Sequence, residues 1–166
     1  MHNEFWRRYL TRWLIGRLRT RSAEIRTYIL QALGKVGDES ALPVILKAAK
    51  DNDSNIRRFA VSALGDMGGT QALDALIFAL NDPESDIRVA AAMALGKLGD
   101  ERAESILIEL LHDEETSVRT QAVIALGHLG STQALPLLGQ MIDAESNEWV
   151  RRYISQAIRE IEGGFC

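Results

Sequence analysis

The chain has few residues that break helices, bind metals or form covalent cross-links. Its 166 residues include 3 prolines, 3 histidines and one cysteine, Cys166. A single cysteine cannot form an internal disulfide, so the fold must be held by packing. No run of 18 apolar residues occurs, and His2, Glu4 and Arg7 interrupt any apolar start, so neither a membrane-spanning helix nor a secretory leader is indicated. We therefore expect a cytoplasmic protein.

Patterns that carry catalysis are also missing. His112 and His128 are separated by 16 positions, and neither stands at metal-ligand spacing from a carboxylate. The sequence has no glycine-rich phosphate loop, nucleophile elbow or C-x-x-C motif. We expect no catalytic residue, no metal and no cofactor, and an enzyme is the less favoured interpretation. With a net charge of −4 and a pI near 5.4, the chain is not expected to bind nucleic acid.

What the chain does contain is a repeated segment. The run from Ile56 to Gly68 has copies that begin at Ile25, Ile87 and Val118, each 31 residues after the last, and a closing variant that begins at Val150 after a step of 32. A fixed period of this size predicts a solenoid, in which each unit buries its apolar face against its neighbours.

Each copy predicts two helices. The first carries apolar residues at i, i+4, i+7, i+8 and i+11, which form one stripe on a helix; the four sets are Ile25, Ile29, Ala32, Leu33 and Val36; Ile56, Ala60, Ala63, Leu64 and Met67; Ile87, Ala91, Ala94, Leu95 and Leu98; and Val118, Ala122, Ala125, Leu126 and Leu129. The small alanine of the Ala63 type lets a neighbouring backbone approach. A left-handed glycine is expected to end each first helix, at Gly37, Gly68, Gly99 and Gly130.

The second helix of each copy follows from another stripe, such as Ala72, Leu73, Leu76, Ile77 and Leu80. Stepping back by one period from Ala41, Ile45 and Ala49 gives Leu10, Leu14 and Leu18, so a lone second helix should precede the first full copy. Arg159 replaces the glycine found at Gly34, Gly65, Gly96 and Gly127, which removes a reason for the last helix to stop before about residue 162.

These patterns predict an all-α fold, a right-handed α-solenoid of about ten helices in one domain. The expected parts are a half-repeat helix at 1–19, full repeats at 20–50, 51–81, 82–112 and 113–143, a closing helix at 144–162 and a tail at 163–166. Polar loops such as Asp51 to Ser54 separate the repeats and can cap the next helix.

The run V/I-R-x-x-A-x-x-A-L-G-x-x-G followed by A-L-x-x-L resembles the short HEAT-like repeats of the phycobilin-lyase type over about residues 20 to 162. This resemblance implies a helical-hairpin solenoid and, as one possible activity, work on bilin attachment. A HEAT-like enzyme family, deoxyhypusine hydroxylase, places His-Glu pairs in its first helices. Here the matching places read Arg26-Thr27, Arg57-Arg58, Arg88-Val89 and Arg119-Thr120, which excludes that chemistry.

An arginine follows the first apolar residue of every copy: Arg26, Arg57, Arg88, Arg119 and Arg151. A feature present in every repeat favours architecture over specificity. Because each loop supplies an acid, at Asp51, Asp82 and Asp113, we expect stacked arginine–carboxylate or arginine–carbonyl bonds. The competing interpretation is a ladder that binds phosphate.

Specificity is expected where the repeats differ, on the concave face lined by the second helices. Three rows of variable positions lie there: Tyr9, Ser40, Gln71, Arg102 and Gln133; Arg12, Pro43, Asp74, Ser105 and Pro136; Gly16, Lys47, Phe78, Glu109 and Gln140. The predicted partner-binding residues are Gln71, Asp74, Phe78, Arg102, Ser105, Glu109 and Gln133. Phe78 is the first hot-spot candidate, because an exposed central aromatic often dominates an interface; the alternative is that it folds back on its own repeat.

Aromatic residues concentrate near the two ends: Phe5, Trp6, Tyr9, Trp13, Trp149, Tyr153 and Phe165. The favoured interpretation is that they cap the core; the alternative is a contact through Trp6, Arg12, Trp13 and Trp149, for instance in a homo-oligomer. Residues 1–26 hold seven arginines against two glutamates, a net charge of +5, so the remainder carries −9.

The leading functional hypothesis is a non-catalytic scaffold that binds a protein or peptide. The second is a phycobilin-lyase-like protein that acts on antenna proteins, and the third is membrane or nucleic-acid association through the basic, aromatic N-terminal helix.

Overall fold

The computed structural model describes residues 2–163, with side chains from Glu4 onward; predictions on Phe165 and Cys166 fall outside this range. Ten α-helices and no strands occur among the described residues, which confirms the all-α solenoid. The first helices of the repeats are α2 (Ala23–Val36), α4 (Ser54–Met67), α6 (Ser85–Leu98), α8 (Thr116–Leu129) and α10 (Glu148–Gly163). The second helices are α1 (His2–Arg17), α3 (Leu42–Ala48), α5 (Thr70–Ala79), α7 (Glu104–Glu109) and α9 (Leu135–Ala144).

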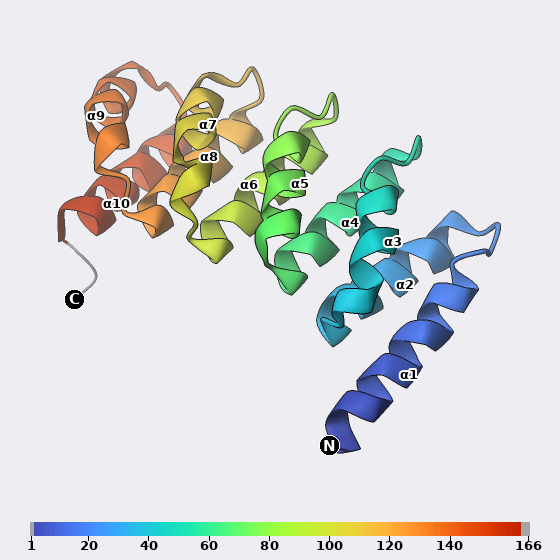
Figure 1. The fold of residues 1–166 in the computed structure, drawn as a ribbon. Helices are drawn as coiled ribbons and strands as arrows, with labels where there is room; N and C mark the ends of the chain where they lie inside the picture. The colour runs from blue at the N-terminus through green and yellow to red at the C-terminus, as the bar shows by residue number, and fades with distance from the viewer. Residues whose placement is uncertain (1, 164–166) are drawn as a thin grey trace. The chain divides into compact units, whose positions relative to one another are not determined.

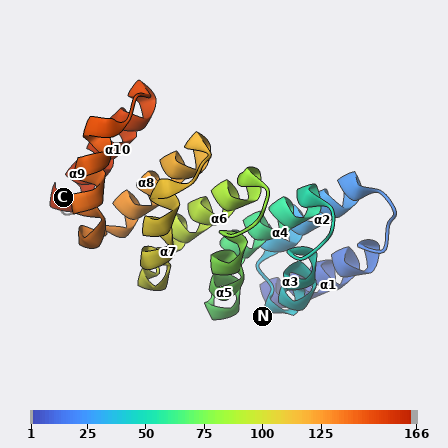
Figure 2. The same cartoon turned by 90° about the horizontal axis from the view of Figure 1, so that it is seen from above.

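Residue contacts divide the chain into two compact units, Met1–Ala94 and Leu95–Cys166. In the first unit α2 and α4 lie side by side, α1 packs on α2, and α3 and α5 pack on α4 (Figure 1). Viewed from above, α3 and α5 lie on the same side of the α2 and α4 layer (Figure 2). In the second unit α8 packs against α10, with α7 on α8 and α9 on α10.

Helix ends follow the predicted loop chemistry. Ser22 and Asp53 accept hydrogen bonds at the starts of α2 and α4, from the backbone N–H groups of Ile25 and Asn55. The four predicted stop glycines all have positive φ, between 63° and 70°. Three second helices begin with a short 3-10 turn that the sequence pattern did not reveal: Glu39–Ala41, Glu101–Ala103 and Thr132–Ala134.

The glycines repeated inside the first helices do not end those helices, as the comparison with Arg159 had implied. Gly34 does not end α2, which continues to Val36. A Cβ built on Gly34 would lie 2.7 Å from the Cα of Ala63, and one on Gly96 would lie 2.9 Å from the Cα of Ala125. These glycines therefore let successive first helices touch backbone to backbone, with the small alanine on the facing side as predicted.

Two residues of the predicted apolar stripes are exposed. Ile25 is 49% exposed, although its counterpart Ile56 is 2% exposed, and Leu10 is 43% exposed. Ile56 lies on α4 against α2, whereas α2 has no preceding first helix among the described residues. α1 instead buries Thr11 and Leu14. Burial of a stripe residue thus depends on the neighbouring repeat.

Replacing Gly34 with Ala tests the close approach. The added methyl meets the Ala63 backbone at 2.7 Å, so we expect a loss of about 1–3 kcal/mol in the free energy of unfolding, measured by denaturant titration. Gly139→Ala is the control, because it adds a methyl inside α9 with nothing within 4 Å and should stabilise by about 0.5–1 kcal/mol. Equal effects of the two substitutions would contradict the packing role.

Candidate binding surface

The repeated arginines serve the architecture. Arg57 donates from Nε and Nη2 to the Asp82 carboxylate at 2.8 and 3.0 Å, and from Nη1 to the carbonyl oxygens of Asp51 and Asn52 at 3.0 and 3.1 Å. Burial raises the pKa of Asp82, but hydrogen bonds from Arg57 and the Glu84 backbone outweigh it and hold that pKa below its usual value. All three guanidinium nitrogens of Arg57 donate inside the protein, which confirms the predicted arginine–carboxylate and arginine–carbonyl bonds.

Other copies of this arginine make the same backbone contacts. Arg88, 8% exposed, donates from Nη1 to the carbonyl oxygens of Asp82 and Pro83 at 2.9 and 3.2 Å. Arg119 donates to the loop carbonyl oxygens before α8 at 2.9 and 3.0 Å and lies 3.6 Å from the Glu145 carboxylate. A buried arginine with such bonds cannot also serve as one rung of a phosphate-binding ladder.

Arg26 departs from this pattern. Its Nη1 lies 3.4 Å from Asp51 Oδ2, and its Nε is buried without a hydrogen-bond partner. The loop before α2 carries Thr20 where later loops carry aspartate. The Thr20 hydroxyl accepts a hydrogen bond from the Ser22 N–H, as the Asp51 carboxylate does from the Asp53 N–H, so the turn is kept. Arg26 nevertheless makes no hydrogen bond to a loop carbonyl oxygen among the described residues.

The three rows of variable positions lie at the surface. All fifteen are exposed, in both units, as expected for the uncovered side of the second helices. The seven residues proposed to bind a partner are among them, on α5 in the first unit (Gln71, Asp74 and Phe78) and on or next to α7 and α9 in the second (Arg102, Ser105, Glu109 and Gln133). Their exposure permits contact with a partner, and their role in binding stays a prediction.

Phe78 does not fold back on its own repeat. Its side chain is 71% exposed, and the Lys50 ammonium lies 6.0 Å from the centroid of its ring. An exposed ring beside a cation offers both apolar area and charge to a ligand.

A basic hollow adjoins Lys50, with a volume of about 570 Å³. Four cations line it together with one carboxylate: Arg19, Arg26, Lys47, Lys50 and Asp51. Apolar side chains, including Leu18, Val44 and Ile56, complete its wall. Sequence reasoning missed this site, although a signal existed: Arg19 and Lys50 stand exactly one period apart, at equivalent places after two second helices.

Arg102 is less available than its row position suggests. Its Nε and Nη2 donate to the Asp100 carboxylate at 3.0 and 2.9 Å, and its backbone N–H donates to the same carboxylate. These bonds lower the pKa of Asp100, with the Arg102 side chain as the main cause. A partner would have to compete with Asp100 for this guanidinium.

The aromatic residues of α1 lie mostly outside the core. Phe5, Trp6 and Tyr9 are 68%, 60% and 59% exposed, and they contact one another edge to face at 5.8 and 6.1 Å. The Arg17 guanidinium lies 4.1 Å above the Trp13 ring. Arg7 anchors the helix by donating to the carbonyl oxygens of Val36 and Gly37. The capping interpretation fits these rings poorly, and a terminal contact through Trp6, Arg12 and Trp13 stays a prediction.

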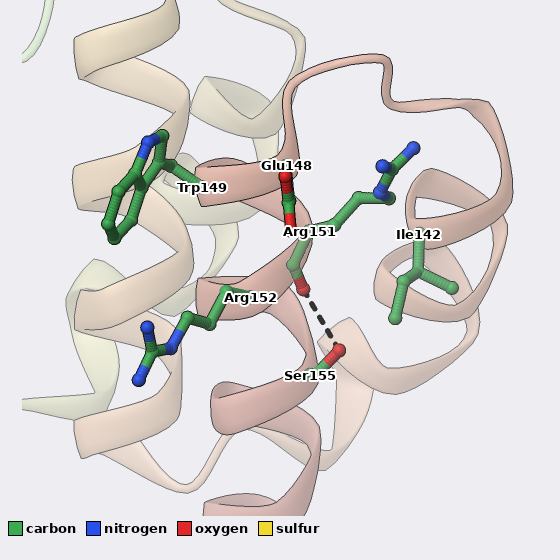
Figure 3. A pocket seen from close by; sticks show the side chains of 6 residues that line it. All are labelled: Ile142, Glu148, Trp149, Arg151, Arg152 and Ser155. Atoms are coloured by element: carbon green, nitrogen blue, oxygen red, sulfur yellow. Dashed lines mark hydrogen bonds between the residues drawn. The ribbon is translucent and has the colours of Figure 1, made fainter.

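On α10, Trp149 is also 68% exposed and borders a second hollow of about 510 Å³. Figure 3 shows Trp149 and Arg152 on one side of α10, with Arg151 and Ile142 on the other. Arg151 donates from Nη1 to the Glu145 carbonyl oxygen at 3.0 Å, and its own carbonyl oxygen accepts from the Ser155 hydroxyl at 2.9 Å. Because the Arg151 guanidinium is hydrogen-bonded to a backbone carbonyl oxygen, this hollow offers fewer cations to a ligand than the one beside Lys50.

No group of three or more potential metal ligands occurs in the described part of the chain. His112 and His128 are both exposed. None of the helices between residues 2 and 163 is long and apolar enough to cross a membrane.

Comparison with known proteins places this geometry among repeat solenoids. The family model for HEAT repeats matches residues 11–85 and 73–159. A chain of the CpcE–CpcF complex of phycocyanin lyase from Nostoc sp. PCC7120 is 25% identical with a TM-score of 0.80; the match covers 92% of this chain and 65% of that one, so this chain spans less than two thirds of its length.

Two further structures share the fold alone. A designed armadillo repeat protein in complex with the peptide (KR)4 is 20% identical, with a TM-score of 0.72 over 89% of this chain and 80% of that chain. Human deoxyhypusine hydroxylase is 17% identical, with a TM-score of 0.52 over 92% of this chain and 84% of that chain. No curated protein matches by sequence.

Replacing Arg88 with Ala tests the structural role of the repeated arginine. The substitution removes a buried guanidinium and leaves the Asp82 and Pro83 carbonyl oxygens without that donor, so we expect a loss of about 2 kcal/mol and a lower melting temperature. Arg152→Ala, at an exposed position, should change the melting temperature little. An unchanged melting curve for Arg88→Ala with loss of partner binding would reverse this interpretation.

Replacing Trp6 with Ala separates a core cap from an exposed contact residue. Because the ring is 60% exposed, we expect the free energy of unfolding to change by less than about 0.5 kcal/mol in chemical denaturation. Leu14→Ala on the same helix is the reference, since this buried side chain should cost about 2–5 kcal/mol. A Trp6 loss as large as the Leu14 loss would restore the capping role.

Proposed function

Because the chain belongs to the HEAT-repeat family, we propose that it is a non-catalytic scaffold that holds a protein or peptide against the exposed faces of its second helices. The observation that carries this proposal is the contrast between two sets of residues. Four of the five repeated arginines, all except Arg26, donate to loop carbonyl oxygens inside the protein, whereas all fifteen positions of the three variable rows are exposed. Variable chemistry on a repeated scaffold is how solenoids distinguish partners.

Phe78 is the centre of this proposed surface in the first unit. It has the size and exposure of an interface anchor, and Lys47, Gln71 and Asp74 supply polar groups on the same and the neighbouring second helix. The likeness to an armadillo repeat protein that holds a peptide supports this use of the fold.

A second candidate function rests on the comparison with the lyase complex. Identity of 25% over most of this chain supports a component that acts, with a protein partner, on bilin attachment to or removal from antenna proteins. The described residues suggest no catalytic group for such a reaction, so this chain would contribute binding and positioning.

Affinity capture with Phe78→Ala tests the scaffold. We expect the substitution to weaken retention of the partner by at least about tenfold, since truncating a central aromatic anchor removes a large part of the binding energy. Tyr28→Ala is the matched control, because its ring is also 71% exposed and lies on the first helix α2, outside the proposed surface. Retention that is unchanged by Phe78→Ala would remove this surface from consideration.

The same eluates are scanned for visible absorbance. A colourless partner supports the scaffold alone, whereas a coloured eluate or a bilin-bearing partner would favour the lyase-related candidate.

A further inference from the structure

The basic hollow carries more positive charge than its surroundings neutralise. Arg19, Lys47 and Lys50 form no ion pair within residues 4–163, and Arg26 has only the 3.4 Å contact with Asp51. Lys47 and Lys50 are exposed at its rim, while Arg26 lies deeper, with 29% of its side chain exposed. The hollow thus presents four cations against one carboxylate.

The two lysines of the hollow have no counterpart in the next repeat. One period after Lys47 the chain has Phe78, and one period after Lys50 it has Asn81. The arginine equivalent to Arg26 in the next repeat is Arg57, which donates hydrogen bonds to the Asp82 carboxylate and to two carbonyl oxygens. Within the described residues, Arg26 is the one repeated arginine without loop-carbonyl bonds, and the hollow places it beside Lys47 of α3 and Lys50 just after α3.

Carboxylates fit this arrangement. The Arg26 side chain lines the hollow and is 29% exposed, so its guanidinium can bind a planar oxyanion there, and the lysines at the rim add point charges. The volume of about 570 Å³ exceeds that of one carboxylate, and the apolar wall at Leu18 and Val44 can contact the methylene groups of acidic side chains.

Lys50 links the hollow to Phe78, because it lines the first and lies 6.0 Å from the ring of the second. We propose that the hollow and Phe78 together bind an acidic, extended segment of the partner protein, with carboxylate side chains in the hollow and an apolar side chain on the ring. This inference rests on the proposed scaffold function and names the chemistry of its partner.

Binding of a labelled peptide tests the proposal directly. The probe is a short fluorescein-labelled peptide of alternating Glu and Leu, followed by fluorescence anisotropy, with Gln–Leu and Lys–Leu peptides as references. We expect the Glu–Leu peptide to bind, its affinity to fall with salt, and the reference peptides to bind at least about tenfold more weakly.

Charge-reversal variants test whether the peptide binds at the basic hollow. Lys47→Glu combined with Lys50→Glu changes two exposed side chains and should weaken binding by at least about tenfold, with an unchanged melting curve. Lys35→Glu combined with Lys97→Glu also reverses two exposed lysines, both outside the hollow, so it is the matched control and should have no effect. Phe78→Ala should weaken the Glu–Leu peptide as well.

Three results would overturn the proposal. These are equal binding of the Gln–Leu peptide, no effect of the Lys47 and Lys50 reversal, or binding of inorganic phosphate in place of the peptide. In those cases the scaffold itself survives if Phe78→Ala still releases the captured partner. If Phe78→Ala also leaves that capture intact, both the acidic-segment proposal and the proposed function fail.

Discussion

The close contact between successive first helices sets the geometry on which the rest depends. Gly34 meets Ala63, Gly65 meets Ala94, and Gly127 meets Ala157, each at a distance that leaves little or no room for a Cβ on the glycine. Backbones held this close fix the spacing between repeats. At that spacing Arg57 reaches the Asp82 carboxylate of the next loop with two hydrogen bonds. The packing thus comes first, and the polar bonds between loops depend on it.

The same residue type serves two purposes in this protein. Arg57 donates from all three guanidinium nitrogens to carboxylate and carbonyl oxygens, whereas the Nε of Arg26 is buried without a hydrogen-bond partner. The difference lies in the loop before each arginine: Arg57 donates to the carbonyl oxygens of Asp51 and Asn52, whereas Arg26 makes no such bond within the described structure. A structural position thereby becomes a candidate binding position when its loop-carbonyl bonds are missing.

The period made most of the fold predictable, because spacing alone defined the helices, the left-handed stops and the arginine bonds. The period did not predict features that depend on contact with a neighbouring helix. Ile25 and Ile56 have the same pattern, yet only Ile56 is covered by another first helix. Gly34 was interpreted through helix termination, although its role is a contact with another repeat. The basic hollow joins residues from several elements, so no single stretch of sequence displays it.

Each loop acid takes part in two repeats, and this has a consequence for how such a chain can change length. Asp82 receives Arg57 from the preceding repeat, while its carbonyl oxygen receives Arg88 from its own. Tandem duplication of one whole period keeps an acid in the next loop for every repeated arginine. Gain or loss of part of a period would leave an arginine or an acid without its partner. The single 32-residue step obeys the same rule, since the acid also moves by one residue, to Glu145, and still meets Arg119.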